Sequence, residues 1–380
     1  MKKIGILGST GSVGKQCLNL IKEFPTKFKV EFLTANSNVQ TLIKQAQMFN
    51  PVYVCIADES KHQLLKKSLP GIEVLSGNSN MQDLCKNNEI DIILNSVSGY
   101  NGLSFSYAAL NSGINLALAN KESIVQAGNI LMELSKLKGA KIFPVDSEHS
   151  AIWQCLIGED IKQVKKIILT GSGGPFRKLP HSKFESITVK EALKHPNWEM
   201  GNKITIDSAT MMNKGFEIIE AFWLFEIDYK YIDVVIHPQS IIHSMVEYID
   251  GSIKAQLSEP TMITPIQFAL SYPERYKSKQ KNFDFIKNNS LTFYEPDFKK
   301  FPCLKLAYES GIKGGTYTTV LNVANDIAVD LFLNKKIKFI DIYRFIDSCI
   351  NKHNNITNPS MDDIYNTRKL TEEYILKELI

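Results

Sequence analysis

The chain has 380 residues, which is too long for one ordinary domain and suits about two or three. Its 44% hydrophobic and 22% charged residues are typical of a globular protein, and no apolar run approaches the ~18 residues of a membrane span. The net charge of +4 comes from 44 basic and 40 acidic residues that are dispersed, so we expect neither a nucleic-acid nor a membrane partner.

The six cysteines are scattered along the chain, and no two of them form a C-x-x-C pair. Several lie in apolar runs, such as Cys55 in PVYVCIAD, which predicts buried thiols in a reduced, cytoplasmic protein without a zinc site. The first residues, MKKIGILGS, have too short an apolar segment for a signal peptide and predict a first strand.

The first 150 residues alternate short apolar runs with amphipathic stretches. This alternation predicts a doubly wound sheet of parallel strands that is buried on both faces. The predicted strands are KIGILG, KVEFLTA, VYVCIAD, DIILNSVSG, INLALAN and AKIFPV.

A different pattern follows, with the strand VKKIILTGSGG, the helix DSATMMNKGFEIIEAFWLF and a hairpin in SMVEYIDGSIKAQL around Asp250-Gly251. We therefore expect an α/β protein with an N-terminal Rossmann-like dinucleotide-binding domain, a central α+β catalytic domain and a C-terminal helical domain. The expected boundaries are 1–147, 148–275 and 301–380, with a charged, Asn-rich linker over 276–300.

Three glycines lie between the first strand and the first helix, at Gly8, Gly11 and Gly14. Such a turn lets backbone N–H groups approach a pyrophosphate at a helix N-terminus, although the G-x-x-G-x-x-G spacing is a variant of the usual fingerprint. The alternative is a turn that only packs a helix on a strand. The second strand ends in Asn36, Ser37 and Asn38 without an acid, which favours NADPH, yet no basic residue stands there for the 2′-phosphate.

The stretch VDSEHSA places Asp146 and Glu148 one residue apart after a predicted strand. If that strand continued, both carboxylates would point to one face and would repel unless a proton, a base or a metal ion compensated. The alternative is a polar loop just past the strand end.

The helix expected over 209–225 has Ser208 as its predicted N-cap, and Asn213, Lys214 and Glu217 share one face of it. Hydroxyl, amide, ammonium and carboxylate groups together suit a phosphorylated polyol, whereas the alternative is a solvated face with a Lys214–Glu217 ion pair. Glu217 can also complete a set of three oxygen donors with Asp146 and Glu148, which suits Mg²⁺ or Mn²⁺.

Six motifs in chain order carry a resemblance to a known family: GSTGSVG, NKES, VDSEHSA, LTGSGGPFR, HPNWEMG and DSATMMNKGFE. Together they resemble 1-deoxy-D-xylulose 5-phosphate reductoisomerase, which makes 2-C-methyl-D-erythritol 4-phosphate in the non-mevalonate isoprenoid pathway. The resemblance extends to HPQSIIHSMVEY and LNVANDIAVDLFL, so that it runs along the whole chain.

The resemblance implies a role for each matching residue. The implied metal ligands are Asp146, Glu148 and Glu217; Lys121 and Ser147 touch the substrate backbone; Ser172, Ser208, Asn213 and Lys214 bind its phosphate, with His195 beside them; and Thr10, Gly11, Ser12, Val13, Asn120, Glu122 and Gly201 contact NADPH. Lys121 and the three metal ligands are the implied catalytic residues. Asn36 and Ser37 depart from the Gly-Lys or Gly-Arg that the family often has there.

The implied reaction is a rearrangement of the carbon skeleton followed by hydride transfer from NADPH, with retro-aldol cleavage or a direct shift both open. We expect a substrate-covering lid over 195–202, because Trp198 and Met200 lie in a Pro/Gly/Asn-rich loop, and a homodimer is implied by the family alone. Two rivals remain: a phosphorylating semialdehyde dehydrogenase, which needs a reactive thiolate, and a redox-sensing dinucleotide-binding protein without catalysis.

Overall fold

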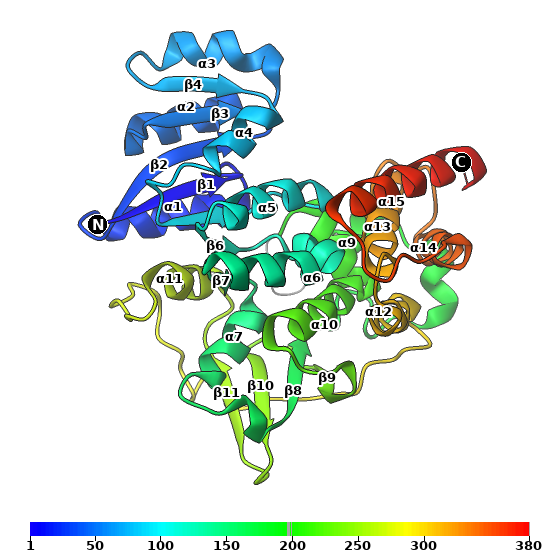
Figure 1. The fold of residues 1–380 in the computed structure, drawn as a ribbon. Helices are drawn as coiled ribbons and strands as arrows, with labels where there is room; N and C mark the ends of the chain where they lie inside the picture. Colours follow the sequence, from blue (N-terminus) through cyan, green and yellow to red (C-terminus); the bar gives the residue numbers. More distant parts are fainter. Residues whose placement is uncertain (196–197, 199, 380) are drawn as a thin grey trace. The chain divides into compact units, whose positions relative to one another are not determined.

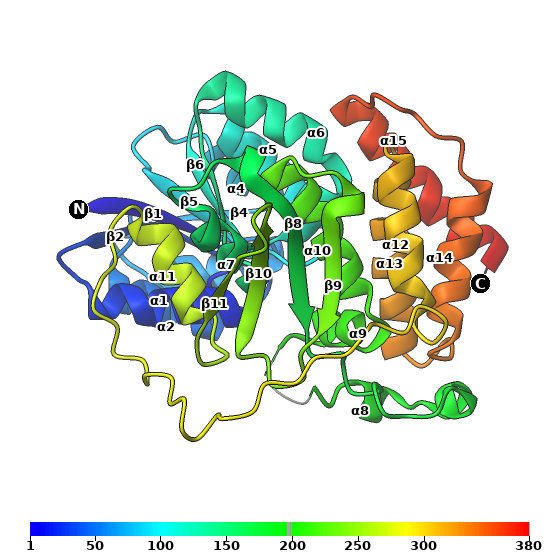
Figure 2. The same cartoon turned by 90° about the horizontal axis from the view of Figure 1, so that it is seen from below.

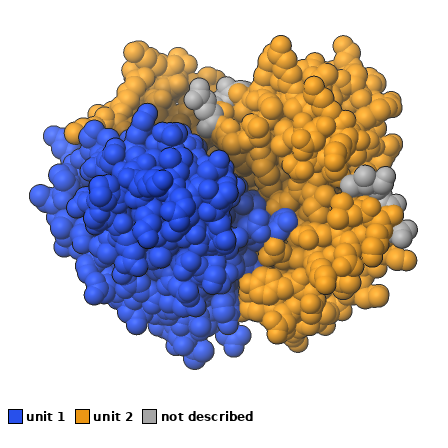
Figure 3. All heavy atoms as spheres, turned by 90° about the horizontal axis from the view of Figure 1, so that it is seen from above, with its two compact units in different colours: residues 1–123, 131–150, 262–278 blue, residues 124–130, 151–261, 279–380 orange. Residues whose placement is uncertain are grey.

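The computed structural model describes residues 1–195, 198 and 200–379, and the chain forms two compact units within them (Figure 3). Unit 1 comprises residues 1–123, 131–150 and 262–278, and unit 2 comprises 124–130, 151–261 and 279–380. Residues 124–130, which belong to the expected first domain, thus lie in unit 2. Residues 262–278, from the end of the expected second domain and the start of the linker, lie in unit 1. The three functional domains expected from the sequence stay a prediction.

Unit 1 is built on a seven-stranded parallel sheet with the order β4-β3-β2-β1-β5-β6-β7 (Figure 1). Its strands are β1 (Lys2–Leu7), β2 (Phe28–Ala35), β3 (Tyr53–Ile56), β4 (Glu73–Ser76), β5 (Ile92–Asn95), β6 (Asn115–Leu118) and β7 (Ile142–Pro144). The connecting helices are α1 (Ser12–Glu23), α2 (Val39–Phe49), α3 (His62–Ser68), α4 (Asn78–Leu84), α5 (Leu103–Asn111) and α6 (Lys121–Lys138). The expected doubly wound fold is confirmed, and β4 is an additional strand that the sequence patterns did not indicate.

The core of unit 1 forms because the apolar strands are covered by apolar helix faces. Ile4, Ile6 and Leu94 of the sheet are fully buried, and they belong to one cluster with Leu18 and Leu42 of α1 and α2. The chain returns to this unit late, as α11 (Ile263–Ser271), whose buried apolar residues join the same cluster. The order of the strands reverses between β1 and β5, which makes the carboxyl ends of these two strands the switch point of the sheet.

Unit 2 contains a four-stranded sheet with the order β11-β10-β8-β9 (Figure 2). Its strands are β8 (Val164–Gly171), β9 (Ile232–Ile236), β10 (Ile242–Tyr248) and β11 (Ile253–Leu257). The predicted hairpin around Asp250-Gly251 is confirmed, because β10 and β11 pair antiparallel across it. β8 pairs antiparallel with β10 and parallel with β9, so this sheet is mixed.

Helices cover this sheet and continue into a helical C-terminal part. They are α7 (Ser147–Leu156, which starts in unit 1), α8 (Val189–Ala192), α9 (Asn202–Thr210), α10 (Met212–Phe225), α12 (Pro302–Lys313), α13 (Tyr317–Leu333), α14 (Asp341–Lys352) and α15 (Met361–Tyr374). Phe216 of α10, Ile167 of β8 and Leu321 of α13 are fully buried in a single cluster. Residues 276–300 contain no helix or strand beyond an isolated bridge between Tyr294 and Ile236, which agrees with a long connection.

Among the described residues, none of the helices combines the length and the apolar character that crossing a bilayer takes.

Candidate active site

The glycine turn lies at the switch point of the unit 1 sheet. Gly8 follows β1 directly and has a φ of +77°, and a Cβ atom there would stand 2.9 Å from the backbone oxygen of Ser96, which follows β5. A Cβ on Gly14 would stand 2.5 Å from the oxygen of Gly8. Larger residues would therefore push the first turn of α1 away from the end of the strand.

The N-terminus of α1 carries backbone donors that no side chain caps. Gly11 is the extended N-cap residue, it makes no side-chain cap hydrogen bond, and the first turn holds no acid. Gly11 and Ser12 are exposed, and Thr10 and Val13 beside them are half-buried. Exposed N–H groups at the positive end of a helix suit a pyrophosphate, as the sequence predicted for these four residues.

The segment after β2 occupies the position where the ribose end of a dinucleotide is held in this fold. Asn36, Ser37 and Asn38 are all exposed there, and Asn38 caps α2 by accepting a hydrogen bond from the Thr41 N–H at 3.1 Å. The backbone oxygen of Asn36 accepts from the N–H of Asp58 at 2.9 Å, which ties this segment to the end of β3.

Asn120 and Glu122 lie at the start of α6, and both are buried. The Asn120 amide donates to the backbone oxygens of Val97 and Gly99, at 2.8 Å each, and to Glu122 at 3.0 Å. Its oxygen caps the helix by accepting from the Ser123 N–H at 3.1 Å. Asn120 therefore fixes the loop after β5 beside the switch point. The expected NADPH contacts of both residues stay a prediction.

Lys121, the first residue of α6, forms an ion pair with Asp146 inside unit 1. His149 is fully buried, with its Nδ1 atom 3.7 Å from the same carboxylate. Burial raises the pKa of Asp146, but the charges and hydrogen bonds of Lys121 and His149 outweigh it and hold this pKa well below its ordinary value. The half-buried Asp146 is thus kept as a carboxylate, the form that a metal ligand requires.

Of the two possibilities that the sequence left open for Asp146 and Glu148, a continuing strand is excluded. β7 ends at Pro144, and α7 begins at Ser147, so the two carboxylates do not alternate on a strand. Asp146 stands just before the helix, where its backbone oxygen accepts from the Ser150 N–H at 2.8 Å, and Glu148 lies in the first turn. Acids are favoured at this end of a helix, because they face its positive dipole. Ser147 donates its hydroxyl to Glu148 at 2.6 Å.

In unit 2, the turn that follows β8 brings three of the predicted phosphate-binding residues together. A Cβ on Gly171 would stand 2.8 Å from the Cε atom of Lys214, and one on Gly174 would stand 2.5 Å from the backbone oxygen of Ser208. The glycines thus let the stem of Lys214 and the end of α9 lie directly against the turn that carries Ser172. Three separate segments, which carry Ser172, Ser208 and Lys214, therefore lie against one turn.

The sequence predicted Ser208 as the N-cap of a helix over 209–225, and this prediction is wrong. Ser208 lies in the last turn of α9. The helical conformation is interrupted at Met211, which has a φ of +64°, and α10 begins at the next residue. A left-handed non-glycine residue costs free energy of roughly 1–3 kcal/mol and persists only where its surroundings enforce it. The break separates Ser208 from the start of α10, where Asn213 and Lys214 lie.

Glu217 is fully buried on α10, and it pairs with Lys214 and accepts a hydrogen bond from the Asn213 amide. The solvated-face alternative is therefore excluded for Glu217 and Lys214, which are 0% and 4% exposed. A buried carboxylate with a cationic partner can stay charged, and removing either partner leaves an uncompensated charge.

Ser172, His195 and Trp198 form a chain of hydrogen bonds. The backbone N–H of Trp198 donates to the Nδ1 atom of His195 at 3.0 Å, so Nδ1 carries no proton and the neutral ring has its proton on Nε2. Nε2 lies 3.1 Å from the Ser172 hydroxyl, which also accepts from the Gly174 N–H at 3.2 Å. With both lone pairs used, Ser172 has its own O–H left to donate to a ligand oxygen.

Acidification is expected to loosen this chain of hydrogen bonds. Burial lowers the pKa of His195 to about 4, below its ordinary value of 6.5, so the unfolded chain binds more protons between these two values. The stabilisation is complete above pH ~6.5 and is lost as the pH falls towards ~4, where a proton on Nδ1 would face the Trp198 N–H. Urea unfolding at several pH values should show a steeper loss for the parent than for His195→Gln. Equal slopes would contradict a neutral, buried His195.

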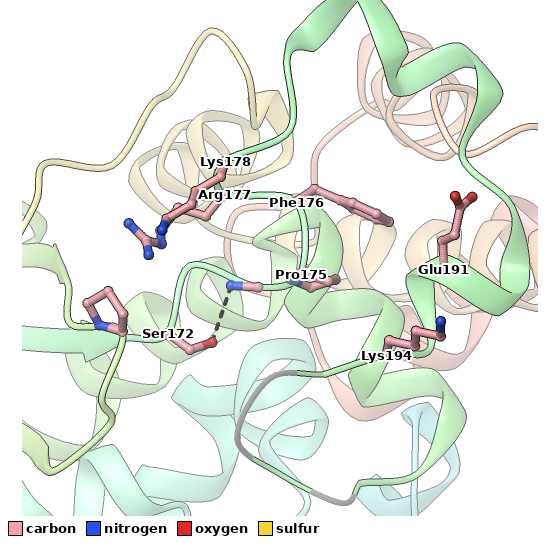
Figure 4. Close-up of a pocket in the computed structure, with 9 residues that line it drawn as sticks. Ser172, Pro175, Phe176, Arg177, Lys178, Glu191 and Lys194 are labelled. Carbon is pink, nitrogen blue, oxygen red and sulfur yellow. Dashed lines mark hydrogen bonds between the residues drawn. The ribbon is translucent and has the colours of Figure 1, made fainter.

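A pocket of about 380 Å³ opens beside Ser172 (Figure 4). Arg177 and Lys178 line it from the segment after β8. Glu191 lines it from α8, and Lys194 from the segment that follows α8. The Arg177 guanidinium lies over the Tyr294 ring at 5.0 Å, which fixes its position. Three cationic side chains against one carboxylate give the pocket a positive potential that attracts anions.

Gly201 is the exposed, extended N-cap residue of α9 in unit 2. Trp198 is half-buried and lies edge-on to the ring of His243 at 6.4 Å. Pro196, Asn197 and Glu199 of the expected lid lie outside the described residues.

His237 lies before β10 and His243 lies within it, and the rings of both are held by hydrogen bonds inside unit 2. The Nδ1 atom of His237 lies 3.0 Å from the backbone oxygen of Thr292, and Nε2 of His243 lies 2.9 Å from the Ser258 hydroxyl. Cys155 is buried in α7, as expected, and all six cysteines are free and buried.

Comparison with known proteins identifies the family of this chain. Family models match three segments: 1-deoxy-D-xylulose 5-phosphate reductoisomerase over residues 4–128, the C-terminal domain of this enzyme over 142–225, and the DXP reductoisomerase C-terminal domain over 257–374. The chain belongs to the 1-deoxy-D-xylulose 5-phosphate reductoisomerase family. The resemblance drawn from the six motifs is therefore confirmed.

Curated reductoisomerases are similar to the chain along its whole length. The enzyme of Thermoanaerobacter pseudethanolicus is 53% identical over 380 residues, covering 100% of this chain and 99% of its own, and that of Chloroherpeton thalassium is 51% identical over 377 residues, covering 99% and 97%. Solved reductoisomerases share the fold: the Zymomonas mobilis enzyme in complex with NADPH has a TM-score of 0.93 at 39% identity, and a DOX-P reductoisomerase in complex with NADPH, fosmidomycin and magnesium has 0.94 at 38%. Both cover 100% of each chain.

The motifs did not point to several residues that contact predicted site residues or their direct neighbours in the sequence. His149 lies three residues after Asp146 in a new helix, and the Asp-x-x-His spacing was a usable signal for their contact. Lys203 pairs with Asp207 at 2.8 Å four residues further on, a spacing that also predicts an ion pair. Asp207 and Asn325 are 118 positions apart, so no local sequence pattern could have predicted their contact.

Proposed function

We propose that the chain converts 1-deoxy-D-xylulose 5-phosphate into 2-C-methyl-D-erythritol 4-phosphate, with NADPH as the hydride donor and Mg²⁺ or Mn²⁺ as the metal. The chain is an NADPH-dependent and metal-dependent oxidoreductase by its family membership, which covers both units. The observation that carries the proposal is the match over the full chain to a reductoisomerase solved with NADPH, fosmidomycin and magnesium.

The rival functions lose their basis. A phosphorylating semialdehyde dehydrogenase needs a thiolate, but burial raises the pKa of all six cysteines, to about 11 even for Cys155. A redox sensor needs no buried carboxylates, whereas Glu217 is fully buried and Asp146 is held in its charged form.

We assign the metal to Asp146 and Glu148 of unit 1 and Glu217 of unit 2. Carboxylates are the oxygen donors that a hard divalent ion takes. In the structure, a lysine balances the charge of two of them, at Asp146 and Glu217. When bound, such an ion supplies Lewis-acid polarisation of the substrate carbonyl. Lys121, beside Asp146, can donate a hydrogen bond to a substrate oxygen, and Ser147 supplies a hydroxyl next to Glu148.

We assign the substrate phosphate to Ser172, Ser208, Asn213 and Lys214. The segments that carry these residues pack against one another at the glycine turn after β8. Ser172 has an O–H to donate to the phosphate, and Lys214 supplies a positive charge. His195 fixes the Ser172 hydroxyl from behind, and through it the backbone at Trp198 is linked to the phosphate site. Closure of the 195–202 segment over the sugar would exclude water from the aldehyde that accepts the hydride.

NADPH fits the glycine turn of unit 1, where Cβ atoms at Gly8 and Gly14 would fill the space and the N–H groups of α1 are uncapped. When bound, NADPH supplies the hydride. Thr10, Gly11, Ser12 and Val13 would hold the pyrophosphate, and Asn36, Ser37 and Asn38 the ribose with its 2′-phosphate. Further contacts are assigned to Asn120, Glu122 and Gly201.

Ser37→Arg should strengthen NADPH binding by about tenfold and leave NADH binding little changed. An arginine there can form a bidentate pair with the 2′-phosphate, whereas the parent has only polar side chains in this exposed segment. Dissociation constants from quenching or enhancement of nicotinamide fluorescence measure both cofactors. A parent that prefers NADH, or an equal gain for both cofactors, would overturn the assignment of residues 36–38 to the ribose phosphate.

We further propose that the enzyme works as a cytoplasmic homodimer. β11 ends the sheet of unit 2, and Ile253, Lys254 and Ala255 on it are exposed, so this edge can pair with a second copy. Six free, buried cysteines suit a reducing compartment. Light scattering on the purified chain and on an Ile253→Pro variant tests the dimer: a monomeric parent, or a variant that dimerises equally, would contradict it.

The function is tested by following NADPH oxidation with 1-deoxy-D-xylulose 5-phosphate, with and without Mg²⁺ or Mn²⁺. We expect turnover only with the metal, and the product identified by mass spectrometry as 2-C-methyl-D-erythritol 4-phosphate. Oxidation of NADPH that is insensitive to chelation, or the absence of turnover with both metals, would contradict the function.

A further inference from the structure

A largely buried network of charges in unit 2, centred on Asp207, joins α9 to α13. Asp207 of α9 is 2% exposed; it pairs with Lys203 at 2.8 Å and accepts a hydrogen bond from the Asn325 amide of α13 at 2.8 Å. Lys203 also pairs with Asp326 of α13 at 2.9 Å and lies 5.0 Å from the Phe216 ring of α10. Two carboxylates, one ammonium and one amide thus link α9 to α13, and the ammonium also contacts α10.

This network ends at the proposed phosphate site. Asp207 precedes Ser208, whose backbone oxygen lies against Gly174 and accepts from the Met211 N–H at 3.2 Å. The backbone oxygen of Asp207 itself accepts from the Thr210 hydroxyl at 3.2 Å. The same turn contains the left-handed Met211, which sets the direction in which α10 leaves. A movement of Asp207 would therefore move Ser208 and reorient Asn213 and Lys214 together.

Stability alone explains such a network poorly. Two charges taken out of water lose hydration free energy that their attraction seldom exceeds, so apolar residues of similar size often stabilise a fold at least as well. A carboxylate that accepts from two helices does what an apolar residue cannot, since hydrogen bonds fix its position and direction. The surrounding turn is strained at Met211 and needs this enforcement.

We infer that Asp207 is a positioning residue of the phosphate site: held by Lys203 and Asn325, it fixes the break between α9 and α10 so that Ser208, Asn213 and Lys214 converge on the substrate phosphate. The inference rests on the proposed function, which assigns those three residues to the phosphate. Asp207 touches neither substrate nor cofactor in this role, and it acts through the backbone of α9.

The test is Asp207→Asn in the full chain. We expect the KM for 1-deoxy-D-xylulose 5-phosphate and the inhibition constant of inorganic phosphate each to rise at least about tenfold, the loss of roughly one charge-assisted contact. The dissociation constant of NADPH should rise less than the two phosphate-dependent constants, because the glycine turn proposed for its pyrophosphate lies in unit 1 and only Gly201 of its proposed contacts stands at α9. Parallel losses of NADPH and phosphate binding, or unchanged constants in the folded variant, would overturn the inference.

Two further variants separate a positioning role from a structural one. The exchange Asp207→Asn with Asn325→Asp restores an amide–carboxylate pair in the reverse sense, so phosphate inhibition should recover by at least about threefold. If Asp207→Asn does not fold, Asn325→Ser removes only the amide donor and should raise the same two constants while retaining the Lys203 ion pair. A folded Asn325→Ser with parent constants would then contradict the inference.

A matched control and a separate variant keep the outcomes distinct. Asp233→Asn removes a carboxylate from β9 that pairs with Lys166 at 2.7 Å and is 49% exposed, and it should change none of the constants. Ser208→Ala tests the phosphate site directly: if it leaves phosphate inhibition unchanged, the proposed site fails. If Ser208→Ala weakens inhibition and Asp207→Asn does not, only the positioning role fails.

Discussion

Glu217→Gln is expected to lower kcat by roughly a thousandfold while the dissociation constant of NADPH stays within about twofold of the parent. The change retains the shape of a fully buried side chain and removes one anionic ligand from the proposed metal site. Metal stabilisation of developing charge is worth several kcal/mol, and about 4 kcal/mol corresponds to the expected thousandfold. NADPH binding should persist, because the glycine turn belongs to unit 1 and Glu217 to unit 2.

Metal binding must be measured separately from turnover for this prediction to be specific. Calorimetric titration with Mn²⁺ should show an affinity at least about tenfold weaker in the variant, since three carboxylates become two. Glu247→Gln on β10, which removes a carboxylate paired with Lys165 at 2.7 Å, is the matched control and should behave like the parent. Parent-like Mn²⁺ affinity in Glu217→Gln would remove Glu217 from the ligand set, whatever its turnover.

The sheet of unit 1 could be predicted because six of its strands are apolar runs buried on both faces. β4 escaped prediction because it is short, lies at an edge of the sheet and has Glu73 exposed, so its sequence lacks a continuous apolar run. The break at Met211 could not be predicted either, since MMNKG has the helical periodicity of its neighbours. The tertiary contacts of α9 with α13 compete with this local preference.

The chemistry of the site was more predictable than its geometry. Asp146, Glu148 and Glu217 were proposed together from residue type and spacing, but the start of a helix at Ser147 was not among the possibilities considered for the first two. Acids directly before and in the first turn of an apolar periodic segment were the available signal. The tautomer of His195 follows from a single backbone N–H that no sequence pattern reveals.

Lys214→Gln is expected to reduce kcat/KM for 1-deoxy-D-xylulose 5-phosphate by about a thousandfold, and the reduction should include kcat. Lys214 carries the positive charge at the proposed phosphate site, and the binding energy of that remote group can be used to align the reacting carbons. The phosphate-free substrate, 1-deoxy-D-xylulose, makes no such contact. Its kcat/KM should therefore change by less than about tenfold in the same variant.

Because Lys214 also pairs with the buried Glu217, the ratio between the two substrates is the decisive quantity. Loss of the lysine as a partner of Glu217 would damage both substrates alike, whereas loss of phosphate binding would damage only the phosphorylated one. Lys166→Gln on β8, whose ion pair with Asp233 is remote from the turn at Gly171, is the matched control for a lost lysine charge. Equal damage to both substrates in Lys214→Gln would assign Lys214 to the support of Glu217 and leave Ser172, Ser208 and Asn213 to hold the phosphate.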